Sequence, residues 1–164
     1  MTIISRFFLA LVLTLSANAA VADSESLYVT QVGNNQQAIV SQQGVTNATS
    51  ISQSGQSNLL QLTQAGTLNT DSAAQIGNNN IAYQNQNGTS NSLILYQNGI
   101  GNYVAQTQTG SKNTDNVRQT GNNNVSTDVQ NGNNNTINKT QTGNGLSSQV
   151  SQQGNNMTVT IAQH

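Results

Sequence analysis

The 164-residue sequence lacks cysteine, proline and tryptophan, and only 5% of its residues are charged. Without cysteine there is no disulfide framework. A formal net charge of −1 gives no basic patch for nucleic acid, so nucleic acid is not an expected partner. Disordered chains are also polar, but they are usually rich in proline and charge. Abundant Asn and Gln without proline and with little charge are instead typical of cross-β assemblies.

Residues with catalytic or metal-binding chemistry are also scarce. Beyond residue 22 the sequence has four Asp, one Glu and one His, which is His164. No two of these form a catalytic pair with a third orienting group, and no cluster has the spacing of metal ligands. We therefore predict that the protein is not an enzyme and that it needs no cofactor or metal.

The N-terminus has the features of a secretory signal peptide. Arg6 precedes an apolar run over residues 7–15, and small residues with Ala-x-Ala spacing follow, ending at Ala19 and again at Ala22. The apolar run is too short to span a membrane. We predict that residues 1–22 are cleaved after Ala22, with Ala19 as the alternative, and that residues 23–164 form one domain without a membrane span.

An eleven-residue repeat occupies the rest of the sequence, and its unit is Q-x-G-x-x-N followed by five variable residues. The Gln positions are Gln31, Gln42, Gln53, Gln64, Gln75, Gln86, Gln97, Gln108, Gln119, Gln130, Gln141, Gln152 and Gln163. The Gly positions are Gly33, Gly44, Gly55, Gly66, Gly77, Gly88, Gly99, Gly110, Gly121, Gly132, Gly143 and Gly154. The Asn positions are Asn47, Asn58, Asn69, Asn80, Asn91, Asn102, Asn113, Asn124 and Asn135, whereas Gln36, Leu146 and Met157 replace Asn in the end units.

Each unit predicts a turn and a strand. All Gly residues lie between the repeated Gln and Asn, where Gly permits positive φ, so this segment is expected to turn. The seven residues from Asn to the next Gln are expected to form a strand, the first starting near Glu25. Asn, the residues two and four positions after it, and the closing Gln then share one face. Aliphatic residues gather on that face, as at Leu60/Leu62 and Leu93/Leu95.

A single strand and turn cannot bury this apolar face, so successive units must stack. We predict an all-β, two-sheet parallel β-solenoid with two strands per 22-residue coil and about thirteen strands. Alternate strands would build opposite sheets, and the stack would be roughly 30 Å tall at ~4.8 Å per coil. Identical inward amides on successive coils can then bond to one another, which accounts for the fixed Gln and Asn columns.

Four charged residues fall on the inward face in this register: Asp71, Asp115, Asp128 and Lys139. Two interpretations remain open. The local register could differ or the core edge could be open to water, or these residues could act as gatekeepers that slow premature assembly. As gatekeepers, Asp71→Ala and Asp128→Ala are expected to shorten the lag of fibre growth. A pairing of Lys139 with Asp128 is a further alternative that the sequence leaves open.

The Q-x-G-x-x-N unit resembles the repeat of the curlin family over roughly residues 27–164. The resemblance implies a homopolymeric extracellular amyloid fibre, with a dedicated outer-membrane secretion pore, periplasmic chaperones, a nucleator, and a role in biofilm matrix and adhesion. The chain departs from the enteric major subunit in having more repeats and only residues 23–26 before the first strand, without a Gly-rich segment. We interpret it as a major subunit, with the nucleator subunit as the alternative.

The sequence also bears on whether the solenoid would polymerise. No cap is evident: the first strand (Leu27, Val29) and the last (Val159, Ile161) carry aliphatic residues on the inward face, where a further copy could stack. The competing interpretation is a secreted monomeric solenoid that binds polysaccharide or ice. Neither a repeated Thr-x-Thr column nor a continuous tyrosine strip supports it. Thr-x-Thr occurs once, at residues 158–160, and the outward tyrosines fall in different columns (Tyr28, Tyr83, Tyr96 and Tyr103).

Overall fold

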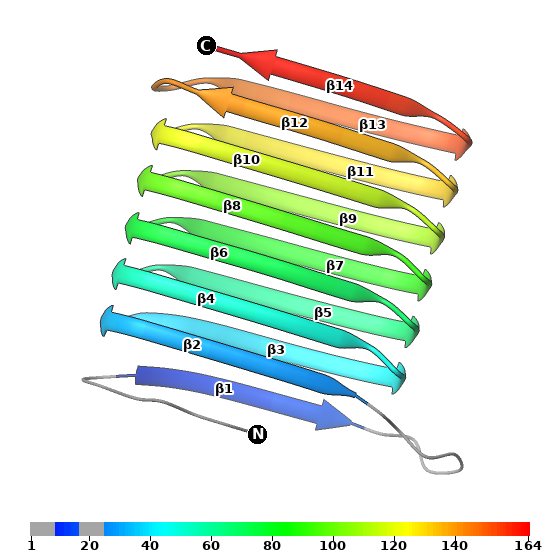
Figure 1. Cartoon of the computed structure of the whole chain (residues 1–164), viewed down its shortest axis with the longest axis horizontal. Coiled ribbons are helices and arrows are strands. Elements are labelled where there is room, and N and C mark those ends of the chain that lie inside the picture. Colours follow the sequence, from blue (N-terminus) through cyan, green and yellow to red (C-terminus); the bar gives the residue numbers. More distant parts are fainter. Residues whose placement is uncertain (1–8, 17–24) are drawn as a thin grey trace.

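The computed structural model describes residues 9–16 and 25–164, with side chains for residues 25–164, and all regular structure in these ranges is β-strand (Figure 1). None of the described residues forms a helix long and apolar enough to cross a membrane. The strands are β1 (Leu9–Ser16), β2 (Ser26–Asn34), β3 (Gln36–Val45), β4 (Ala48–Gln56), β5 (Leu59–Thr67), β6 (Thr70–Asn78), β7 (Ile81–Thr89), β8 (Ser92–Ile100), β9 (Tyr103–Ser111), β10 (Thr114–Asn122), β11 (Val125–Asn133), β12 (Thr136–Thr142), β13 (Ser147–Asn155) and β14 (Thr158–Gln163).

The strands build two parallel sheets that face each other, as the repeat predicts (Figure 1). One sheet has the order β1-β3-β5-β7-β9-β11-β13, and the other has the order β14-β12-β10-β8-β6-β4-β2. Successive strands therefore alternate between sheets, and each residue pairs with its equivalent two repeat units later, as Gln86 pairs with Gln108 and Gly88 with Gly110. The predicted two-sheet β-solenoid, with two strands and two repeat units per coil, is confirmed, and β2 to β14 are its thirteen expected strands.

Strand β1 is an addition to the predicted solenoid. It lies inside the segment predicted to be a signal peptide and pairs in parallel with β3, with Leu11 opposite Ala38 and Leu15 opposite Gln42. The two cleavage positions, Ala19 and Ala22, lie outside the described residues, and cleavage stays a prediction. In the 164-residue chain, then, the edge of β3 is occupied by a strand from the predicted signal peptide.

The strand boundaries differ from those expected. Most strands begin directly after the repeated Asn and run through Gln and Gly, as β7 contains both Gln86 and Gly88. The reversal comes two residues after this Gly, at a residue with left-handed φ; Ser90 has φ 57°. Gly101 and Gly145 occupy this left-handed position with φ 68° and 67°, as their place in the repeat predicts.

Close approach between coils explains the regular glycine. Gly88 has φ 134°, and a Cβ added to it would lie 1.9 Å from the carbonyl oxygen of Gly110 in the next coil. At the reversal the requirement is a left-handed backbone, which asparagine tolerates. Asn79 and Asn123 adopt it with φ 56° and 55°. The repeated Gly therefore lets adjacent coils pack at the spacing of a parallel sheet.

The interior follows the predicted alternation. Residues two and four positions after the repeated Asn point inward, and the buried aliphatics are Ala38, Val40, Ile51, Leu60, Leu62, Ala73, Ala82, Leu93, Leu95, Val104, Val117, Ile137 and Val150. Many of them are alanine or valine, so the apolar core between the sheets is thin. Amide side chains fill the remaining columns, and they form the site described below.

We expect Gly88→Ala to destabilise the solenoid by more than about 3 kcal/mol, because it adds a backbone clash to a strained φ. The matched control is Gly145→Asn, since nothing lies within 4 Å of a Cβ at Gly145 and its φ is 67°. Guanidinium titrations followed by circular dichroism measure both. Equal midpoints for the two variants would contradict the steric role of the repeated Gly.

Candidate functional site: the interior amide ladders and the solenoid ends

The thirteen repeated Gln side chains form two continuous hydrogen-bonded ladders, one on each sheet. One ladder runs from Gln31 to Gln163 and the other from Gln42 to Gln152. In each link Nε2 of one Gln donates to Oε1 of the Gln in the next coil, over 2.5–3.1 Å, and no link is missing. All but the last are fully or nearly fully buried. The ladders have one direction, because in every link the amide nearer the N-terminus donates.

The second N–H of most ladder Gln residues ties the two sheets together. Gln86 Nε2 donates to the carbonyl oxygen of Thr70 on β6 of the facing sheet at 2.9 Å, and Gln108 does the same to Ser92 at 3.0 Å. Both hydrogens and the oxygen of such an amide are therefore satisfied. A buried amide is tolerated only under this condition, since each orphaned polar group costs about 1–3 kcal/mol.

The repeated Asn residues have a second role that the sequence pattern did not reveal. Each of the nine donates from Nδ2 to the carbonyl oxygen of the repeated Gly 19 residues later, over 2.7–3.1 Å. Each also accepts, on Oδ1, the backbone N–H of the equivalent residue in the next coil over 3.0–3.2 Å. Gln36, a departure from the sequence pattern, donates equivalently to Gly55 at 3.1 Å.

The two ends of the Gln ladders are chemically complementary. At the N-terminal end, Oε1 of Gln31 and of Gln42 is buried and has no partner among the residues with described side chains. At the C-terminal end, Nε2 of Gln152 and Gln163 donates one hydrogen to a backbone carbonyl, at 3.2 Å in each case. Because a primary amide has two N–H donors, each keeps one for an acceptor beyond the last coil.

The aliphatic residues of the end strands are incompletely covered, as the sequence predicts. Leu27 and Val29 on β2, and Val159 and Ile161 on β14, are half-buried, whereas equivalent residues inside the stack, such as Leu60, are fully buried. No helix covers either end within residues 9–16 and 25–164. The ends therefore present both unfilled amide positions and apolar surface in the same pattern as the interior.

All four predicted inward charges are buried in the core, which excludes both a register difference and an open core edge. Their side chains come from β6 (Asp71), β10 (Asp115), β11 (Asp128) and β12 (Lys139). Lys139 Nζ donates to Asp128 and the two form an ion pair, so the pairing that the sequence left open is present. Ser126 also donates to Asp128 at 3.0 Å.

Burial raises the pKa of all three carboxyl groups. For Asp115 the negative charge of Asp128 adds to the effect of burial, and Lys139 opposes it. For Asp128 the hydrogen bond and charge of Lys139 partly offset the burial. Asp71 lies apart from this group and accepts a hydrogen bond from Gln84 at 3.1 Å, and burial raises its pKa to about 8. Asp71 is therefore mainly a neutral acid at pH 7.

Because of the ion pair, the two expected gatekeeper substitutions have different consequences. Asp71→Ala removes a single acid whose ionisation opposes folding. Asp128→Ala, by contrast, leaves the buried Lys139 ammonium without its carboxylate, and breaking one side of a buried pair is strongly destabilising. A shortened lag is still the expectation for Asp71→Ala, whereas the geometry no longer favours that result for Asp128→Ala.

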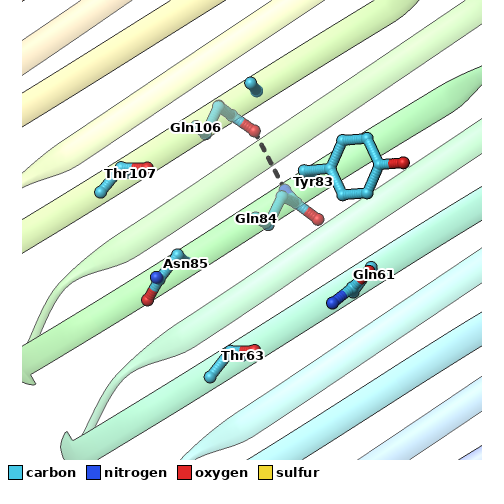
Figure 2. Close-up of a pocket in the computed structure, with 8 residues that line it drawn as sticks. Gln61, Thr63, Tyr83, Gln84, Asn85, Gln106 and Thr107 are labelled. Carbon is cyan, nitrogen blue, oxygen red and sulfur yellow. Dashed lines mark hydrogen bonds between the residues drawn. The ribbon is translucent and has the colours of Figure 1, made fainter.

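The outer face of the β3–β13 sheet has a polar depression of about 260 Å³ (Figure 2). Its lining includes Gln61, Tyr83 and Thr107, and beneath it Gln84 donates to Gln106 at 3.0 Å. The rings of Tyr83 and Tyr103 lie 6.0 Å apart, so two of the outward tyrosines are neighbours although they occupy different columns. The depression is open to solvent and lacks charged groups.

The outward columns are otherwise irregular. One column of the β2–β14 sheet reads Tyr28, Ser50, Ser72, Ile94, Asn116, Asn138 and Thr160, and its neighbour includes Tyr96 packed under the Arg118 guanidinium at 5.0 Å. No group of three or more potential metal ligands occurs among the described residues. Regularity is thus confined to the inward columns and to the ends that expose them.

No protein-family model, curated protein or solved structure matches this chain. The functional argument therefore rests on the ladders, the ends and the buried charges.

We predict that Gln86→Leu lowers the free energy of unfolding by about 2–6 kcal/mol, because it leaves the Gln64 donor and the Gln108 acceptor buried without partners. The control is Gln61→Leu on the exposed face of β5, expected to change stability by less than about 0.5 kcal/mol. Denaturant midpoints measured in parallel test this. Similar losses in both variants would remove the ladder as the cause.

A pH dependence follows from Asp71. Its pKa is about 8 in the folded chain against 3.8 for the ordinary carboxyl, so the folded state holds a proton that the unfolded state has lost between these values. The stabilisation is fully present below pH 3.8 and is lost as pH rises towards 8. Asp71→Asn should flatten the decline of the guanidinium midpoint between pH 4 and 8. An unchanged slope would show that Asp71 does not contribute to it.

Proposed function

We propose that this protein is a structural subunit of an extracellular functional amyloid fibre of the curlin type, which grows by end-on stacking of solenoids. The observation that carries the proposal is the complementarity of the two ends: orphaned amide oxygens at one, spare amide hydrogens at the other. A second copy would continue the sheets, the ladders and the apolar columns at once. Soluble solenoids cover such ends with capping segments.

Export and cell-surface function complete the proposal. The predicted signal peptide supports secretion, and the curlin-like repeat supports a fibre at the bacterial surface that contributes to biofilm matrix and adhesion. A nucleator, an outer-membrane secretion pore and periplasmic chaperones are the partners that this resemblance implies. The scarcity of Lys and Arg near the C-terminus favours a major subunit over a nucleator.

A monomeric surface-binding solenoid is the competing function. Tyr83, which lines the polar depression (Figure 2) and lies 6.0 Å from Tyr103, favours it locally, since aromatic rings stack on sugars. The outward columns oppose it, because an ice or polysaccharide lattice is matched by a side-chain column that repeats from coil to coil. Selection on the outer face would make that face regular, whereas the regular residues here are the buried ones.

Dilution of denatured residues 23–164 into buffer, followed by thioflavin T fluorescence and fibre diffraction, tests the proposal. We expect a lag, sigmoidal growth and a meridional reflection near ~4.7 Å. Seeding then compares the chain as nucleator and as major subunit. A β-rich chain that stays monomeric would favour the surface-binding function.

A pair of variants on β14 tests end-on growth itself. Ile161→Lys places a charge on the inward, half-buried column at the growing end, and we expect elongation on wild-type seeds to fall at least tenfold. Thr160→Lys adds the same charge to the exposed face of the same strand and should elongate nearly normally. Equal elongation rates would argue against stacking through this end.

A further inference from the structure

The number of strands in the solenoid restricts how a second copy can stack, and this inference rests on the proposed end-on assembly. Strands alternate between the two sheets, and the thirteen strands β2 to β14 are an odd number. Both β2 and β14 therefore lie in the same sheet. The next position in the winding, beyond β14, belongs to the other sheet, above β13.

An unrotated second copy fits this end poorly. Its β2 would stack on β14, and its β3 would lie two strand positions beyond β13, which leaves one position of that sheet empty. Moving the copy closer to fill that gap would drive its β2 into β14. One ladder would then be broken at every junction, with a spare donor on Gln152 and an orphaned acceptor on Gln42.

A half-turn about the fibre axis removes this conflict. The β2 strand of the incoming copy then continues the sheet of β13, and its β3 continues the sheet of β14. Gln152 comes opposite Gln31, and Gln163 opposite Gln42, which pairs each spare donor with an orphaned acceptor. Val159 and Ile161 come opposite Ala38 and Val40, so the apolar columns also continue.

The leader strand provides independent evidence that this edge accepts a strand. In the full-length chain β1 is paired in parallel with β3, with Leu13 opposite Val40 and Leu15 opposite Gln42. This is the position that β14 of a half-turned copy would take. Position 15 is a leucine, which has no side-chain amide, whereas the side-chain amide of Gln163 in a second copy could donate to Gln42.

We propose that consecutive subunits are related by a half-turn, with β14 of one copy on the β3 edge of the next, and that the uncleaved leader blocks this edge. The partner is a second copy of this chain. Each subunit adds six and a half coils, so the rise is ~31 Å at ~4.8 Å per coil. Cleavage of the leader would then expose the docking edge only in the exported protein.

Intermolecular disulfides distinguish the two arrangements, because the chain has no cysteine of its own. With Gln163 opposite Gln42, Ala162 lies opposite Ser41; in the unrotated arrangement it lies opposite Thr30. Adjacent strands bring such residues to ~4.8 Å, within disulfide range. In fibres of residues 23–164 we expect cross-linked oligomers from A162C/S41C, and neither from A162C/T30C nor from A162C alone.

The outcomes separate this inference from the proposed function. Fibres that cross-link through A162C/T30C would overturn the half-turn but retain end-on assembly. Fibres that cross-link through neither pair would overturn the half-turn and indicate assembly through another contact. An absence of fibres in every variant would instead overturn the proposed function itself.

Deletions can change whether the number of strands is odd or even, which is called strand parity here. Deleting residues 48–58 leaves twelve strands, so the rotation between subunits in a helical reconstruction should change from about a half-turn to almost none. Deleting residues 48–69 leaves eleven strands and should keep the half-turn, which controls for loss of a repeat. A rotation that does not follow parity would overturn the inference.

The blocking role of β1 has its own test. The full-length A162C/S41C chain should cross-link at least tenfold more slowly than residues 23–164. Introducing V12P and L13P, which removes two consecutive strand N–H groups, should restore the fast rate because proline cannot complete a parallel ladder. Equal rates for the full-length and shortened chains would show that β1 does not guard the edge.

Discussion

A buried primary amide has two N–H donors and one acceptor oxygen, and it cannot use solvent water to satisfy them. The solenoid depends on meeting this requirement at every coil: each ladder Gln donates to the Gln of the next coil and, in most cases, also to a carbonyl of the facing sheet. The stacking distance of parallel strands suits such a chain of amides. The thin apolar core, about half of it alanine and valine, is supplemented by the ladders, which add a directional interaction that joins both sheets.

The same requirement controls the backbone. The Asn columns bond to the carbonyl oxygens of the repeated Gly, so the side-chain ladder and the reversal are held as one unit. The repeated Gly in turn allows the coils to approach without a Cβ between them. A ladder of this type cannot be complete in a monomer, because its first member lacks a donor and its last lacks an acceptor. The polymerisation proposed above would satisfy both ends without a separate cap.

The buried charged residues affect the stability of this ladder-based core. Asp71 and the Asp115, Asp128 and Lys139 group occupy columns that elsewhere hold mainly aliphatic residues, and burial favours the protonated carboxyl. Stability consequently depends on pH in the direction opposite to that of a surface carboxylate in an ion pair. Asp71 and Asp115 lie inside the stack, whereas Asp128 and Lys139 lie one strand from its C-terminal end, opposite Val150 and Ile161.

The coil length, the alternation of sheets and the inward columns could be predicted from the sequence, because a fixed eleven-residue register leaves one way to bury the aliphatic positions. It also identified Asp71, Asp115, Asp128 and Lys139 as inward. The position of the repeated Gly inside the strand could not be predicted in this way, since the contact that requires Gly comes from the equivalent Gly of the next coil. The direction of the ladders, the Lys139–Asp128 pair and the place of β1 on the β3 edge were likewise decided in three dimensions. Each depends on which atoms face one another across coils, and spacing along a chain does not specify that.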